Sequence, residues 1–113
     1  MKRATAPSFP VSIFIAGDYE RASYVCRGFC GRAGLCVTTT PVRYIYTDGQ
    51  EDGVVVGLIN YPRFPSTPAQ IAETAKGLAL ELMAELGQQS VSIQTPDETT
   101  WFSIRSADIG ASQ

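Results

Sequence analysis

The sequence predicts an α+β fold, in which a mainly antiparallel or mixed sheet carries two helices packed on one face. Three observations predict it. Segments that read as strands outnumber those with helical periodicity, and only two segments carry both a helical pattern and helix caps. Turns rich in Gly, Pro and Asp join most of the strands, which is typical of hairpins. A doubly wound parallel sheet, which needs a helix between successive strands, is therefore disfavoured.

The elements are expected in the order β-α-β-β-β-α-β-β. Val11, Ile13 and Ile15 alternate with other residues and mark the first strand. Asp18 is a suitable N-cap for the first helix, and Gly34 is a natural stop after it. Runs rich in β-branched and aromatic residues indicate further strands. The expected elements are strand 11–16, helix 19–32, strands 35–39, 42–47 and 54–61, helix 68–86, and strands 91–95 and 99–105.

Proline and polar residues mark the remaining boundaries. Thr67, Pro68 and Gln70 fit the start of the second helix as N-cap, first helical residue and capping-box partner. Pro41 is expected to interrupt the strands on either side of it. The polar residues 48–53 are expected to form the loop of a hairpin. We expect a single domain over residues 1–113, with flexible ends at 1–8 and 106–113.

Composition and charge argue against several classes of protein. No apolar stretch of the 113 residues approaches the ~20 residues that a membrane-spanning helix needs. The net charge of −2 argues against a protein that coats DNA or RNA. Seven Arg against two Lys hint at recognition of phosphate or carboxylate groups, although a composition bias explains the excess equally well. We therefore expect a cytoplasmic protein with no membrane or nucleic-acid polymer as partner, of a size at which forming a homo-oligomer helps.

Residues suited to catalysis are scarce. The chain has no His, which removes the commonest general base and metal ligand, and it has no nucleophile elbow, Walker A or zinc-protease motif. Cys26, Cys30 and Cys36 are interpreted as reduced core cysteines rather than redox or metal-binding residues. The carboxylates in residues 48–52, Glu51 among them, are interpreted as a solubilising hairpin tip. We therefore expect a binding protein and not an enzyme, with no catalytic residue, metal or cofactor.

The most informative segment is residues 53–68, where an apolar strand gives way to a loop stiffened by two prolines. Its amide, guanidinium and aromatic rings can recognise a planar, anionic small molecule. Rings would stack on an adenine at ~1–3 kcal/mol per base, and arginines would contact a diphosphate. The alternative is that the rings fill the core and the arginines are solvated. The candidate ligand-binding residues are Arg43, Asn60, Tyr61, Arg63, Phe64, Trp101 and Arg105.

Several segments together resemble the first-described type of phage-encoded Thoeris anti-defence proteins. They are IFIAGD at 13–18, the Cys-Arg-x-Phe-Cys helix at 26–30, the run from GLCVTTTP to INYPRFP at 34–65, and TPDETTWFS at 95–103. The resemblance implies a sponge that binds the cyclic ADP-ribose isomer signal of the Thoeris system in the infected host, without degrading it. It also implies possible capture of cyclic oligonucleotides and assembly into dimers or hexamers, with ligand sites between subunits. It assigns no individual binding residue.

Two other functions stay open beside the sponge. An enzyme could cleave the signal, or an inhibitor could bind a defence enzyme directly. The first is disfavoured because the sequence shows no base or metal set, and the second because such proteins usually expose a larger apolar patch.

Overall fold

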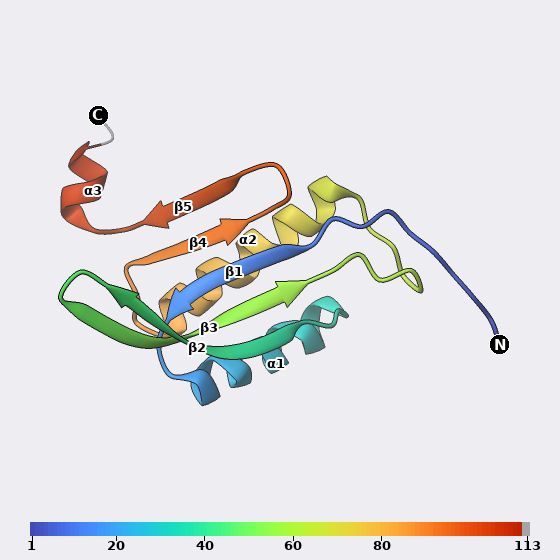
Figure 1. Ribbon diagram of the computed structural model, residues 1–113, viewed down its shortest axis with the longest axis horizontal. Helices are drawn as coiled ribbons and strands as arrows, with labels where there is room; N and C mark the ends of the chain where they lie inside the picture. The colour runs from blue at the N-terminus through green and yellow to red at the C-terminus, as the bar shows by residue number, and fades with distance from the viewer. Residues whose placement is uncertain (112–113) are drawn as a thin grey trace.

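The computed structural model describes residues 1–111 as a five-stranded sheet with helices on one face (Figure 1). The strand order is β2-β3-β1-β4-β5, and every neighbouring pair is antiparallel. Helices α1 and α2 pack side by side against β1, β3 and β4. The predicted α+β fold is confirmed. The elements are β1 (Val11–Ala16), α1 (Tyr19–Ala33), β2 (Thr38–Tyr46), β3 (Gly49–Leu58), α2 (Pro68–Glu85), β4 (Ser90–Gln94), β5 (Thr99–Ser103) and α3 (Ser106–Ala111).

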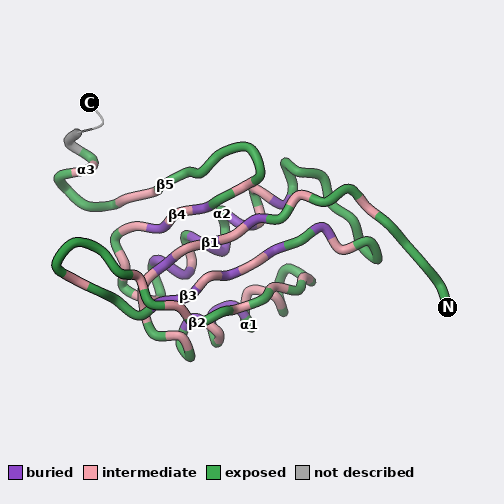
Figure 2. Tube along the Cα trace, in the orientation of Figure 1, coloured by how far each residue is buried: buried purple, intermediate pink, exposed green. Residues whose placement is uncertain are grey.

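The core lies between the two long helices and the middle strands. Strand β1 is central, and Ile13 lies opposite Val56 of β3 and Ile93 of β4. All three side chains are buried, together with Leu78 and Leu82 of α2, which are fully enclosed. Figure 2 shows the buried residues on the central strands and on the helix sides that face them. Burial of this apolar surface is the main source of stability.

The helix boundaries follow the predicted caps. The Asp18 side chain accepts a hydrogen bond from the Arg21 amide at 2.9 Å, and Gly34 ends α1 in the left-handed conformation at φ 69°. Thr67 and Gln70 form the full capping box of α2. Both helices therefore begin at the residues that the sequence indicated.

The β2–β3 hairpin is longer than predicted. Strand β2 continues through Pro41, because β2 is an edge strand and tolerates a residue without an N–H group. Strand β3 begins at Gly49, so the loop is only Thr47 and Asp48, and Asp48 has a positive φ of 63°. The polar residues at the start of β3 are therefore paired with β2 rather than looped.

The C-terminal tail differs from the prediction as well. Helix α3, beyond the end of β5, was not predicted from the sequence. The expected flexibility of residues 1–8 and 106–111 stays a prediction, and residues 112–113 lie outside the described part of the chain. None of the helices in residues 1–111 is both long and apolar enough to span a bilayer.

Candidate functional site

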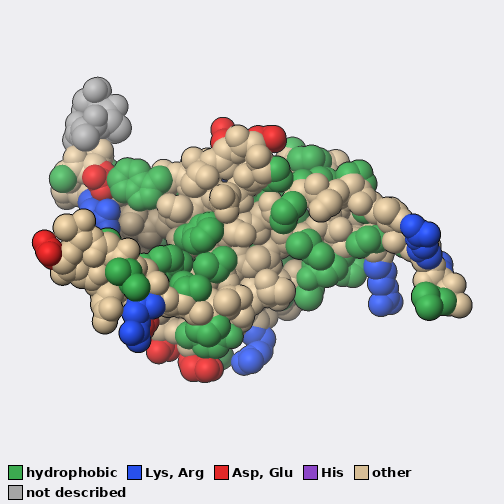
Figure 3. Space-filling view, viewed as in Figure 1, with side chains coloured by type: hydrophobic (Ala, Val, Ile, Leu, Met, Phe, Trp, Pro, Cys, Tyr) green, Lys and Arg blue, Asp and Glu red, His purple; other side chains and the backbone are tan. Residues whose placement is uncertain are grey.

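The sheet has one face that α1 and α2 do not cover, which we call the open face. Side chains of Ser12, Phe14 and Ala16 point to it, since their neighbours in β1 are buried under the helices. Phe14 lies opposite Val55 of β3 and Ser92 of β4, and all three are half-buried. Figure 3 shows hydrophobic side chains gathered over the middle of the sheet. An exposed antiparallel face is usually polar, so apolar residues at its centre point to an interaction surface.

A cleft of about 320 Å³ lies where β1 ends and β4 begins, toward one end of the sheet. The β2–β3 hairpin lies on one side of this end and α3 on the other (Figure 1). The cleft combines an aromatic floor with hydroxyl groups and one charge of each sign. Its lining residues are Phe14, Ile15, Ala16, Tyr44, Glu51, Gln88, Ser90, Val91, Ser92 and Arg105.

The hairpin wall of the cleft is formed by Tyr44 and Glu51, which are cross-strand partners. The Tyr44 hydroxyl donates a hydrogen bond to the Val54 carbonyl at 2.7 Å, and burial raises the pKa of this phenol. Tyr44 therefore stays protonated at neutral pH and is held in one orientation. The pKa of Tyr46 is raised first by desolvation and then by the Glu51 carboxylate. This carboxylate therefore lies close to the Tyr46 hydroxyl.

The opposite wall carries Arg105, which follows β5. Its side chain is 49% exposed and lies 3.6 Å from a carboxylate oxygen of Asp108. Glu51 and Arg105 form no ion pair with each other among the described residues. The cleft therefore offers a carboxylate and a guanidinium to a ligand that carries both charges.

A second groove, of about 380 Å³ between α1 and α2, is less suited to a ligand. Four of its five charged side chains pair with one another, as Arg21 with Glu85 and Arg32 with Glu81. Arg32 donates to Glu81 at 2.6 Å, and the Arg21 side chain donates to the Glu85 carbonyl at 2.8 Å. An incoming ion would have to break these contacts, so we place the candidate site in the open-face cleft.

The structure puts the seven candidate residues in three places. Arg105 lines the cleft, and Trp101 lies on the open face opposite Ser92, with 53% of its surface exposed. Arg43 lies on the other side of the hairpin and pairs with Asp52 at 3.2 Å. The remaining four belong to the loop between β3 and α2. One chain does not bring all seven together, and their joint role in binding stays a prediction.

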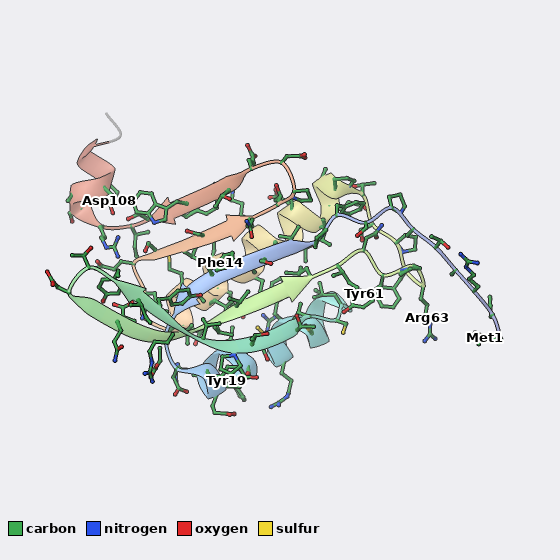
Figure 4. The ribbon with its side chains drawn as sticks, viewed as in Figure 1. Met1, Phe14, Tyr19, Tyr61, Arg63 and Asp108 are labelled. Carbon is green, nitrogen blue, oxygen red and sulfur yellow. The ribbon has the colours of Figure 1, made fainter. Side chains whose placement is uncertain are left out.

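Within that loop, the Tyr61 and Phe64 rings pack at 5.5 Å between centroids, beside a small cavity of about 60 Å³. The Tyr61 hydroxyl donates to the Cys36 sulfur at 3.4 Å. Arg63 projects away from the sheet (Figure 4), and its side chain has no hydrogen bond or ion pair to residues 1–111. The loop therefore offers a ring pair but no closed anion site.

Asn60 has a structural role in the same loop. It is 7% exposed, donates to the Pro7 carbonyl at 2.9 Å and accepts from the Ser66 amide at 2.7 Å. The sequence predicts Asn60 as a ligand-binding residue, and in the structure the partners of its amide are backbone groups. Asn60 thereby ties the N-terminal segment to the loop before α2.

We expect Asn60→Ala to destabilise the fold by about 1–3 kcal/mol, because it removes the two hydrogen bonds that the buried Asn60 side chain makes to backbone groups. Chemical denaturation measured by circular dichroism would show this loss. Arg63→Ala in the same loop is the control and should change the stability by less than about 0.5 kcal/mol. Equal stability of the two variants would contradict the assigned role of Asn60.

The cysteines are free thiols. Burial raises the pKa of Cys26 to about 11, and burial followed by the neighbouring Cys36 raises that of Cys30. Cys36 is exposed rather than inside a strand. In residues 1–111, no group of three or more His, Cys, Asp or Glu side chains is arranged to hold a metal ion. Cys26 and Cys30 are therefore poor thiolates at neutral pH.

Tyr44, Glu51 and Phe14 line the cleft, and none of them is among the candidates that the sequence offers. The sequence predicts Glu51 in a solubilising loop, whereas it lies in β3 opposite Tyr44. The signal that could have found it is the pairing of the two strands across a two-residue turn. That pairing puts a tyrosine and a glutamate next to each other on one face.

Comparisons with known proteins identify a shared fold. No family model and no curated protein matches the chain. Two solved structures match, both of a phage SAM lyase. The apo structure has a TM-score of 0.69 and 18% identity, covering 93% of this chain and 96% of that chain. The complex with S-methyl-5′-thioadenosine has a TM-score of 0.66 and 16% identity, covering 91% and 95%.

This likeness corrects the expectation that the protein is not an enzyme. The chain shares its fold, over nearly the whole length of both chains, with a phage SAM lyase, and that neighbour is an enzyme. The expectation rested on the missing His and nucleophile, and their absence excludes only mechanisms that need them. The neighbour is a phage protein with a bound nucleoside, which agrees with the class of ligand expected here. The Thoeris sponge itself is not confirmed.

Proposed function

We propose that the protein is an enzyme that binds S-adenosylmethionine in the open-face cleft and cleaves it to S-methyl-5′-thioadenosine. The observation that carries the proposal is the full-length likeness to a phage SAM lyase that binds this thioadenosine. At this identity the likeness supports the fold, and the support for the chemistry comes from the residues of the cleft.

The cleft matches the three recognisable parts of S-adenosylmethionine. Phe14 offers an aromatic face for the adenine, a contact worth ~1–3 kcal/mol per base. The Glu51 carboxylate offers a counter-charge to the sulfonium, and the Arg105 guanidinium suits the substrate carboxylate. The opposite charges lie on opposite walls, as a substrate with a cationic sulfur and an anionic carboxylate requires.

The cleavage can proceed without a base or a nucleophile from the protein. The substrate carboxylate oxygen attacks its own γ-carbon, and the bond from that carbon to sulfur breaks. The bonding pair passes to the sulfur, so a neutral thioether leaves and a homoserine lactone remains with its ammonium group. No proton moves. The protein has to hold the carboxylate in line with the breaking bond. It also has to prevent the bound substrate from adopting conformers in which the carboxylate lies away from the γ-carbon.

The test is to incubate purified protein with S-adenosylmethionine and measure both products by mass spectrometry. We expect thioadenosine and the lactone, or homoserine formed from it, in equal amounts and well above a protein-free sample. That control is essential because the substrate also decomposes slowly in solution. The proposal would be overturned if S-adenosylmethionine broke down no faster with the protein than in the protein-free sample.

The sponge hypothesis predicts a different outcome. A sponge would bind a cyclic ADP-ribose isomer, and denaturing the complex would return that ligand intact. The Tyr61 and Phe64 rings favour this second function, since they pack together in a proline-stiffened loop. Titration with both ligands therefore separates the two proposals.

We also propose that the protein acts in the cytoplasm of a phage-infected bacterium and as a homo-oligomer. Val55 and the exposed Trp101 on the open face support association, because they leave apolar surface in contact with water. Native mass spectrometry with and without ligand would report the number of subunits.

A further inference from the structure

Arg105 is held from two sides by a small hydrogen-bonded unit at the end of β5. The Ser103 hydroxyl donates to the Asp108 carboxylate at 2.5 Å and accepts from the Arg105 amide at 3.1 Å. The same Asp108 oxygen lies 3.6 Å from the Arg105 guanidinium. Figure 4 shows Asp108 on α3, beyond the end of β5. The backbone and the side chain of Arg105 are therefore both fixed through Asp108 and Ser103.

The unit is also tied to the sheet and to α3. The Ile104 amide donates to the Gln89 carbonyl at 2.8 Å, which joins this segment to the residue before β4. The Ile109 amide donates to the Arg105 carbonyl at 3.0 Å, which closes the turn of α3. Asp108 is half-buried, with 30% of its side chain exposed. Helix α3 therefore presents a fixed carboxylate behind the one cationic side chain of the cleft lining.

The contact between Asp108 and Arg105 leaves the guanidinium able to bind. At 3.6 Å it is an ion pair and not a hydrogen bond, so it orients the charge without using the N–H donors. A guanidinium has five such donors in a planar fork, which suits a carboxylate. A carboxylate ligand can thus bind Arg105 while Asp108 stays in place.

We propose that Asp108 is a positioning residue that holds Arg105 for the carboxylate of an amino-acid-bearing nucleoside. This inference rests on the proposed function and makes it more specific. The charges of Glu51 and Arg105 on opposite walls select a ligand that carries both a cation and a carboxylate over a plain nucleoside. Asp108 and Ser103 do not touch this ligand and act through Arg105.

The experiment compares two molecules that differ in the amino-acid part. S-adenosylmethionine has the carboxylate, and S-methyl-5′-thioadenosine lacks it. We expect Asp108→Asn to raise the KM for S-adenosylmethionine about tenfold, because the contact between Arg105 and the substrate carboxylate is weakened. The inhibition constant of the thioadenosine should stay within about twofold of its wild-type value. Asp108→Glu should restore most of the lost affinity. Ser103→Ala should raise the same KM by a smaller factor, since it keeps both charges.

Asp97→Asn, on the turn between β4 and β5, is the matched control and should leave both constants unchanged. The thermal midpoint of each variant reports its folding. If Asp108→Asn cleaves the substrate with an unchanged KM, the inference is overturned and the proposed function stands. If both ligands lose affinity together, Asp108 supports the cleft as a whole and the inference is again overturned. If the wild-type protein neither binds nor cleaves S-adenosylmethionine, the proposed function is wrong, whatever the variants show, and the inference that rests on it is overturned as well.

Discussion

Glu51→Gln is expected to raise the KM for S-adenosylmethionine by about fivefold, the upper end for an exposed pair of opposite charges. Its carboxylate lines the cleft opposite Arg105, and the proposed substrate brings a sulfonium with no hydrogen-bond donor of its own. The attraction is therefore purely electrostatic, and a neutral amide of the same shape removes it. Glu51 is exposed, so salt should weaken the effect.

The effect on kcat should be small or even favourable. Positive charge on the sulfur is partly lost in the transition state, so Glu51 interacts more strongly with the bound substrate than with the transition state. We expect kcat to stay within about threefold of wild type or to rise. The affinity for the neutral thioadenosine should not change.

Steady-state kinetics of Glu51→Gln and Glu51→Asp, with Glu98→Gln as the control, would measure these effects. Glu98 lies in the turn between β4 and β5, outside the cleft lining. A loss of kcat with KM preserved would instead assign Glu51 to the chemical step and contradict this account of the cleft.

The fold was predictable because its signals are local. The alternation of Val11, Ile13 and Ile15 and the capping residues Asp18 and Thr67 act within a few residues of themselves. A sheet with helices on one face follows once strands and helices are counted and the hairpins are recognised; β2–β3 and β4–β5 are hairpins, and each of the other two strand connections contains a helix. These local signals do not predict which strands pair with each other, nor that β1 lies in the centre of the sheet.

The cleft was not predictable because its parts come from four distant segments. Glu51 lies in a polar run with no strand alternation, since the hairpin extends beyond the helices and neither of its faces is covered there. Arg105 was among the candidates, but the α3 residue that holds it lies in a tail with no recognisable helix pattern. Asn60 was among the candidates as a ligand-binding residue, and its amide hydrogen-bonds to the backbone of Pro7 and Ser66, segments that lie far apart in the sequence.

The expectation of no enzyme rested on a search that covers only part of enzyme chemistry. A search for His, nucleophiles and metal sets detects reactions in which the protein supplies the reacting group. A substrate that carries its own nucleophile and leaving group needs only orientation and charge. Arg, Glu and aromatic side chains can supply these, and they are common on any protein surface.

Gly53→Ala is expected to destabilise the protein by about 3 kcal/mol, at the upper end of the cost of overpacking. A β-carbon there would lie 2.5 Å from the backbone carbonyl oxygen of Ile15 and 2.4 Å from the Tyr44 ring. The backbone of β1 cannot move aside without disturbing its pairing with β3, in which Ala16 lies opposite Gly53. The Tyr44 ring, which lines the cleft, would be displaced as well.

Gly31→Ala is the matched control, because a β-carbon at that position in α1 meets nothing within 4 Å. In a helix interior this substitution should stabilise by about 0.5–1 kcal/mol. Urea denaturation gives both free energies of unfolding. The same two variants also test the site, since Gly53→Ala should weaken thioadenosine binding under conditions in which it is still folded. Full stability together with wild-type affinity in Gly53→Ala would contradict the packing of Tyr44 over Gly53.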